Sequence, residues 1–141
     1  GVFRAGRPFR GAGPARPGAP SALAPAMMPT RPLAVRVRAC AARRDLPGLA
    51  RAVRSAGPKM LVSAWPSLSP LERLAAFKSL SRRGAHTAFA LLDGDGRWLA
   101  YLGAPLQSVA PLLEGVPKKS LRLLRTPGAA ERGAMRRALL R

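Results

Sequence analysis

The residue types that most often carry catalysis or hold a metal are scarce in this chain. It contains one histidine, His86, and one cysteine, Cys40. Acid–base or nucleophilic catalysis needs a histidine, a cysteine or a carboxylate cluster whose pKa is perturbed in a cleft. We interpret His86 as a surface or capping residue and Cys40 as a small buried hydrophobe. Two such ligands are too few for a zinc site within the chain. We therefore expect no enzyme, no metal and no other cofactor.

The segment Asp93-Gly94-Asp95-Gly96 is similar to the beginning of a calcium-binding loop. That loop needs oxygen ligands as far as a glutamate at its twelfth position. Position 104 of this chain is an alanine. We therefore interpret the segment as a tight turn. The chain also lacks a glycine-rich loop followed by Lys-Ser or Lys-Thr that would hold nucleotide phosphates, so we expect no small-molecule substrate.

Arginine is the residue with binding chemistry that the chain has in excess. The 141 residues include 25 Lys+Arg, of which 21 are arginine, and only 6 Asp+Glu, giving a formal net charge of +19. Like charge at this density opposes compaction unless a polyanion neutralises it. Arginine can hold phosphate bidentately, and each phosphate contact releases counterions. A GC-rich genome would raise arginine relative to lysine, but it would not remove the acids. Structural RNA is therefore the favoured partner.

The candidate phosphate-binding side chains fall into groups at the beginning and the end of the chain. Contacts of this kind position a protein on RNA rather than read its sequence. The predicted RNA-binding residues are Arg4, Arg7, Arg10, Arg16, Arg31, Arg36, Arg38, Arg43, Arg44, Lys118, Lys119, Arg122, Arg125, Arg132, Arg136 and Arg137.

Residues 1–32 have a composition unlike the rest of the chain. Glycine and proline recur every few positions, which removes backbone donors and blocks helix propagation. Residues 1–44 carry nine arginines and no acid, a composition that overlaps with mitochondrial targeting segments. The segment is either a removable presequence or a retained extension that becomes ordered on a partner. We expect the retained extension.

Secondary-structure signals begin near residue 33. The alternation of Leu33, Val35 and Val37 predicts a strand. Asp45 is suited to cap a helix that ends before Gly57-Pro58. Ser69-Pro70-Leu71-Glu72 has the pattern of a capping box, and we expect that helix to close at Arg82-Arg83-Gly84.

The second half of the chain shows a hairpin signal. Two runs rich in aromatic and aliphatic residues, 86–92 and 97–102, flank the Asp-Gly turn, which predicts a β-hairpin. We further expect a short helix over 107–114 and a third strand over 120–125. A final helix opens after Thr126-Pro127, with Met135 and Leu139 on one face and Arg132 and Arg136 on another.

These elements predict an α+β fold. It would be a small single domain with a β-hairpin and two to four helices, plus a long extended basic N-terminal tail. The predicted boundaries are residues 1–32 for the tail, 33–126 for the α+β domain and 127–141 for a basic C-terminal helix. No internal repeat was recognised, and no apolar run reaches the roughly 18 residues that a membrane-spanning helix needs.

A small domain with long arginine-rich extensions resembles the organellar ribosomal proteins as a class. The resemblance implies a structural, rRNA-contacting component of a mitochondrial ribosome, whose extensions neutralise phosphates and fill gaps between neighbouring proteins. The implied location is the mitochondrial matrix, with the plastid as an alternative. The competing interpretation is an accessory structural subunit of a mitochondrial respiratory complex or ATP synthase, in which the tail lies on acidic proteins or anionic lipid.

Overall fold

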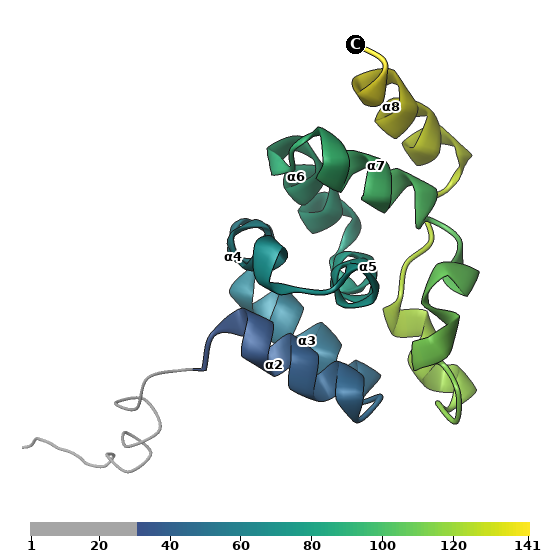
Figure 1. Ribbon diagram of the computed structural model, residues 1–141. Helices are drawn as coiled ribbons and strands as arrows, with labels where there is room; N and C mark the ends of the chain where they lie inside the picture. The colour runs from purple at the N-terminus through teal and green to yellow at the C-terminus, as the bar shows by residue number, and fades with distance from the viewer. Residues whose placement is uncertain (1–30) are drawn as a thin grey trace, which may run out of the picture. The chain divides into compact units, whose positions relative to one another are not determined.

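The computed structural model describes residues 31–141, and every regular element in that range is helical (Figure 1). The predicted tail, residues 1–32, thus lies almost wholly outside the described residues. The elements in chain order are α2 (Leu33–Ala42), α3 (Leu46–Ala56), α4 (Pro58–Ala64), the 3-10 turn η2 (Trp65–Ser67), α5 (Pro70–Ser79), α6 (Arg82–Leu91), α7 (Gly94–Leu102), the 3-10 segments η3 (Leu106–Leu112) and η4 (Lys118–Leu123), and α8 (Ala129–Leu139). The α+β prediction is therefore wrong: residues 31–141 contain no strand and more helices than the two to four expected.

The predicted strand at residues 33–38 is the beginning of helix α2. Leu33, Val37 and Cys40 are buried, whereas Val35 is exposed, so the buried positions follow the helical period. Three alternating apolar residues are too short a pattern to decide between the periods, and the alanines among residues 34–42 favour a helix. Pro32 precedes the first helical residue, where its missing N–H costs nothing.

Helices α2 and α3 are joined by a tight turn, and the predicted cap at Asp45 is confirmed. The Asp45 carboxylate accepts a hydrogen bond from the Gly48 backbone N–H at 3.0 Å. At the other end of α3, Gly57 adopts a positive φ of 91°, which a side chain would disfavour. Pro58 then opens α4.

Helices α5, α6 and α7 repeat one capping device every twelve residues, a repeat that was not recognised in the sequence. Leu68, Leu80 and Leu92 are buried immediately before the three N-caps. The caps are Ser69, Ser81 and Asp93, and each accepts from the backbone N–H three residues later. In each unit an alanine and then an aromatic residue follow, eight and nine residues after the leucine: Ala76-Phe77, Ala88-Phe89 and Ala100-Tyr101.

The predicted β-hairpin is wrong because its turn signal is a helix cap. Asp93 Oδ1 accepts from the Gly96 N–H at 2.7 Å and begins α7, while the preceding run lies in α6. Residues 85, 88, 89 and 92 are buried together, which is a helical spacing. An aspartate followed by glycine serves both devices, so the dipeptide alone does not separate a hairpin from an N-cap.

The capping box at Ser69 and Glu72 is confirmed, but its helix ends earlier than expected. Both reciprocal hydrogen bonds are present. Helix α5 ends at Ser79, and Arg82 and Arg83 open α6 instead of closing α5.

The predicted third strand at 120–125 is mostly the 3-10 segment η4. One backbone bond, from the Arg125 N–H to the Lys78 carbonyl at 2.7 Å, ties its end to α5. The predicted helix over 107–114 is the 3-10 segment η3, in which Pro111 and the non-helical Val109 interrupt a regular helix.

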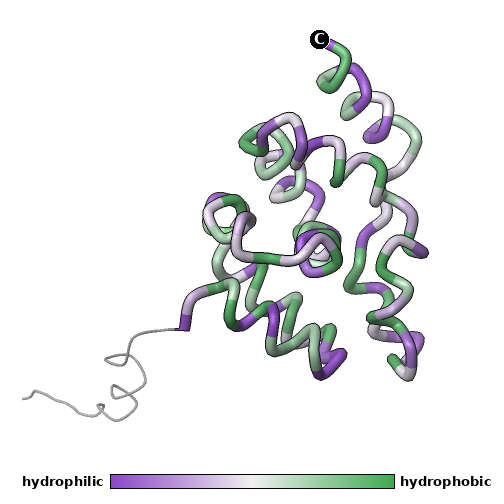
Figure 2. Tube along the Cα trace, viewed as in Figure 1, coloured by the Kyte–Doolittle hydropathy of each residue, from purple (hydrophilic) through white to green (hydrophobic). Residues whose placement is uncertain are grey.

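Pro32–Arg141 pack as one compact unit around leucine, valine, alanine and aromatic side chains. Helices α7 and α5 approach closely where α7 ends, because a Cβ on Gly103 would clash with the Leu74 side chain of α5. The final helix is confirmed as α8, with Met135 buried, and Figure 2 shows hydrophilic and hydrophobic residues following one another along it. No helix in the described range is long and apolar enough to cross a membrane.

Candidate nucleic-acid interface

Arginine has two distinct uses in the described residues, and one of them is structural. Arg54 Nε donates to the Ser79 carbonyl at 2.7 Å, at the end of α5. Arg38 donates to the Ser67 carbonyl at 2.6 Å, at the end of η2. The last carbonyls of a helix lack partners within it and carry the negative end of its dipole. These guanidinium groups therefore stabilise the fold itself.

Two further arginines cap helix ends and also stack on aromatic rings. Arg97 donates to the Phe89 carbonyl at 3.0 Å and the Ala90 carbonyl at 2.8 Å, with its guanidinium 5.9 Å from the Phe89 ring centroid. Arg73 donates to the Trp65 carbonyl at 2.8 Å and lies 5.8 Å from the Trp65 ring centroid. Such contacts combine hydrogen bonding with cation–π attraction.

Several predicted RNA-binding residues have intramolecular partners. Arg125 forms a 2.7 Å ion pair with Glu131, and both side chains are largely buried. Arg43 and Arg44 lie 3.7 and 3.9 Å from acidic oxygens of Asp45 and Glu114 in exposed pairs, which contribute little stability in water. Arg38 is hydrogen-bonded at η2, so only some arginines of the predicted α2 group lack an intramolecular partner.

The Arg44–Glu114 pair brings the α2–α3 turn beside the segment that leads into η4. We call this surface the basal patch and define it as Arg43, Arg44, Lys118, Lys119 and Arg122; all five are exposed. Lys118, Lys119 and Arg122 have no hydrogen bond or ion pair to another described side chain. The structure therefore joins two groups that lie some 75 positions apart in the chain.

The second cationic surface runs along α8, and we call it the α8 face: Arg132, Arg136 and Arg137. Arg132 stacks over Tyr101, with its guanidinium carbon 4.6 Å from the ring centroid. Arg136, Arg137 and Arg141 are exposed and pair with no carboxylate among the described residues. Helix α8 packs on α7, so this face is separate from the basal patch (Figure 1).

The remaining predicted residues form no hydrogen bond or ion pair with either surface among the described residues. Arg36 is half-buried on α2 and Arg31 is exposed. Arg4, Arg7, Arg10 and Arg16 lie outside the described residues.

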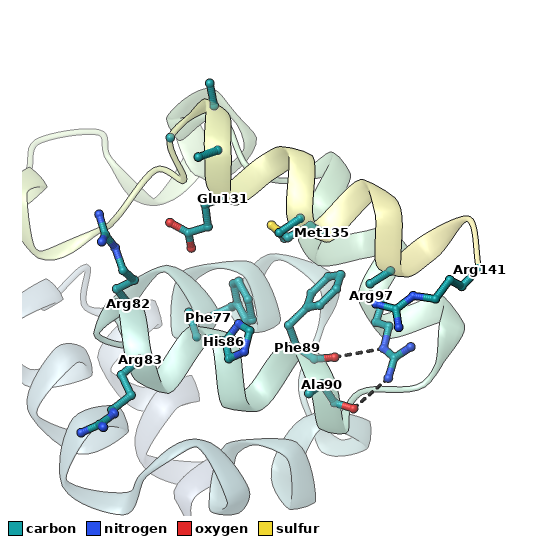
Figure 3. A pocket seen from close by; sticks show the side chains of 16 residues that line it. Phe77, Arg82, Arg83, His86, Phe89, Ala90, Arg97, Glu131, Met135 and Arg141 are labelled. Carbon is teal, nitrogen blue, oxygen red and sulfur yellow. Dashed lines mark hydrogen bonds between the residues drawn. The ribbon is translucent and has the colours of Figure 1, made fainter.

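Sequence reasoning missed the cations around α6. Arg82, Arg83, Arg97 and Arg141 line a cavity between α6 and α8, together with His86 (Figure 3). Arg82 and Arg83 occupy the first turn of α6, which contains no acid. Positive charge there opposes the helix dipole. The twelve-residue capping register was the signal that would have placed them at a helix start.

One buried cation is not available to any ligand. Lys78 is 3 % exposed and its Nζ donates to the Ala104 carbonyl, which ties α5 to the segment before η3. Burial, and then the positive charge of Arg125, lower the pKa of Lys78 from 10.5 to about 8. Its role is structural.

The residues that could hold a metal are dispersed in the described range. Cys40 is buried and His86 is exposed on α6. Among residues 31–141 no three His, Cys, Asp or Glu side chains gather around one point. The chain matches no protein-family model, and neither a curated protein nor a solved structure is significantly similar to it.

Proposed function

We propose that this chain is a structural RNA-binding protein that holds phosphates through the basal patch and the α8 face. One observation carries this function: the exposed cations of these two surfaces include Lys118, Lys119, Arg136 and Arg137, which have no acidic partner within residues 31–141. Ammonium and guanidinium groups that the fold does not use remain available for phosphate.

The charge balance of the whole chain supports the same partner. Three of the six acids are already paired, Asp45, Glu114 and Glu131, and each pairs with an arginine. The arginines of residues 1–30 add further positive charge with no acid beside them. A polyanion is the ligand that relieves this repulsion.

The assembly that we propose is a mitochondrial ribosome, in which such a protein contacts rRNA and neighbouring proteins. Its support is the composition and the layout of cationic ends around a small core. The chain, tagged at its C-terminus, should sediment with ribosomal subunits from mitochondrial lysate and should be released by ribonuclease. Sedimentation with a respiratory complex or ATP synthase, unaffected by ribonuclease, would contradict this assembly.

The binding chemistry itself is tested by salt. The full chain should bind a fluorescently labelled duplex RNA, and a plot of log affinity against log salt should be linear. Its slope should be negative, with a magnitude of roughly 0.7 to 0.9 for each phosphate contact. A slope near zero would refute phosphate binding. Replacing Lys118 and Lys119 by glutamine should make the slope shallower, whereas Arg54→Gln, which removes a charge that is already engaged, should change it less.

A further inference from the structure

A cavity of about 1160 Å³ lies between α6 and α8, away from the basal patch. Its wall includes aromatic and thioether side chains, Phe77, Phe89 and Met135, which also belong to the buried core. Figure 3 shows these side chains between the two helices. The cavity is open to one side, so we describe it as the α6–α8 groove.

The groove is hollow because the α8 side chains that line it include several alanines. Ala130, Ala134 and Ala138 recur every four residues, which places them on one stripe of the helix. Ala85 and Ala90 line the α6 side. The stripe leaves room at van der Waals distance for the side chains of another element.

Positive charges stand at both ends of the groove. Arg82 and Arg83 lie at the beginning of α6, and Arg97 is hydrogen-bonded to the carbonyls at its end, beside Arg141 (Figure 3). A helix of ten residues is about 15 Å long, so the two pairs are about three helical turns apart. The one acid in the lining, Glu131, is neutralised by Arg125.

This charge pattern selects among occupants. A fatty acid or lipid has one anionic end, and its apolar end would meet two guanidinium groups. Duplex RNA presents no apolar surface to cover the aromatic wall. A second copy of this chain, at +19, is repelled. What fits is an apolar stripe about three turns long with carboxylates at both ends.

We infer that the α6–α8 groove docks an amphipathic helix of a neighbouring protein that carries acidic residues at both ends of its apolar face. Leucine or similar side chains of the partner fill the hollow over the alanine stripe. Its carboxylates pair with Arg82 and Arg83 at one end and with Arg141 at the other, where Arg97, held by the Phe89 and Ala90 carbonyls, adds positive charge. This surface acts independently of RNA binding, so one can be true without the other.

The probe for this inference is a synthetic helical peptide of three to four turns, with leucines along one face and glutamates at both ends. Its binding to the full chain is measured by fluorescence anisotropy. We expect Ala134→Trp, which fills the groove without changing charge, to weaken binding at least tenfold. The double variant R82E/R83E should weaken it by a similar factor. All three positions are exposed, and circular dichroism verifies that the variants are folded.

The matched control is K118E/K119E, which makes the same change in charge on the basal patch. It should leave peptide affinity within about twofold while lowering affinity for RNA. A peptide with lysines in place of the glutamates should not bind. Unchanged affinity in Ala134→Trp, or equal losses in the two double variants, would overturn the inference. Laurate or duplex RNA is also tested as a competitor of the peptide. If either ligand binds the wild type in place of the peptide but does not bind Ala134→Trp, the groove belongs to that ligand and the inference is overturned.

Discussion

The helices α2–α7 and the segment from η3 to α8 differ in how their helices are capped and in how many of their residues are buried. In the first region, helices α3, α5, α6 and α7 each begin with a side-chain cap, and arginines close helix ends through carbonyls. In the second, η3, η4 and α8 have no side-chain N-cap, and few residues are buried. Side-chain caps and arginine–carbonyl bonds thus stabilise the first region, whereas several cations of the second, among them Lys118, Lys119, Arg136 and Arg137, have no acidic partner among residues 31–141.

The largest expected contrast is in the response to truncation of buried side chains. Leu49 is fully buried among α2–α7, so Leu49→Ala should lower the free energy of unfolding by about 3–5 kcal/mol. Met135→Ala should cost less, about 2 kcal/mol, because Met135, although buried, lines the groove, so its loss enlarges an existing opening. Urea denaturation measures both. Equal losses would abolish the distinction between the two regions.

The contact between the regions should depend on pH through Lys78. Its pKa is about 8 in the folded protein and near 10.5 when unfolded, so between these values the unfolded chain holds the proton that the folded one has lost. The penalty for the buried charge is fully present below pH 8. Stability should therefore rise with pH across this window, by up to about 3 kcal/mol.

The variant Lys78→Met serves as the control for this rise. The relevant quantity is the difference in the free energy of unfolding between wild type and variant at each pH. That difference should change with pH in the window between 8 and 10.5. A pH-independent difference would show that Lys78 keeps an ordinary pKa.

A smaller effect is expected from the repeated capping device. Asp93→Ala removes the acceptor for the Gly96 N–H at the start of α7 and should cost about 1 kcal/mol. Asp93→Asn, which retains an acceptor oxygen, should recover most of that loss. Thermal unfolding followed by circular dichroism compares the two. A loss as large in Asn as in Ala would mean that charge, not capping, stabilises α7.

Much of the first region could be predicted from local pattern, and the error there has a physical cause. The caps at Asp45 and Ser69 depend on neighbours three residues away, so the sequence contains all that is needed. Asp93-Gly94 was misassigned because the same dipeptide suits a hairpin. The pair of a buried leucine and a cap recurs at residues 68–69, 80–81 and 92–93. This repeat distinguishes a helix cap from a hairpin turn at Asp93, but only when all three units are compared.

The candidate site could be predicted only in part, because the use of an arginine depends on tertiary contacts. Arg38 meets Ser67 across 29 positions and Arg54 meets Ser79 across 25. Nothing local separates Arg38, which is committed to a helix end, from Arg136, which is not. The α6–α8 groove likewise exists only once α8 is packed near α6.

The central claim, that Arg136 and Arg137 of the α8 face bind RNA without supporting the fold, is tested most directly by one double variant. Arg136→Gln with Arg137→Gln is measured in parallel for unfolding and for binding to duplex RNA. We expect the free energy of unfolding to stay within about 0.5 kcal/mol of wild type, while RNA affinity falls and the salt slope becomes shallower by roughly 1.4 to 1.8 for two lost contacts. An unchanged slope and affinity, or a variant that no longer folds, would contradict the claim.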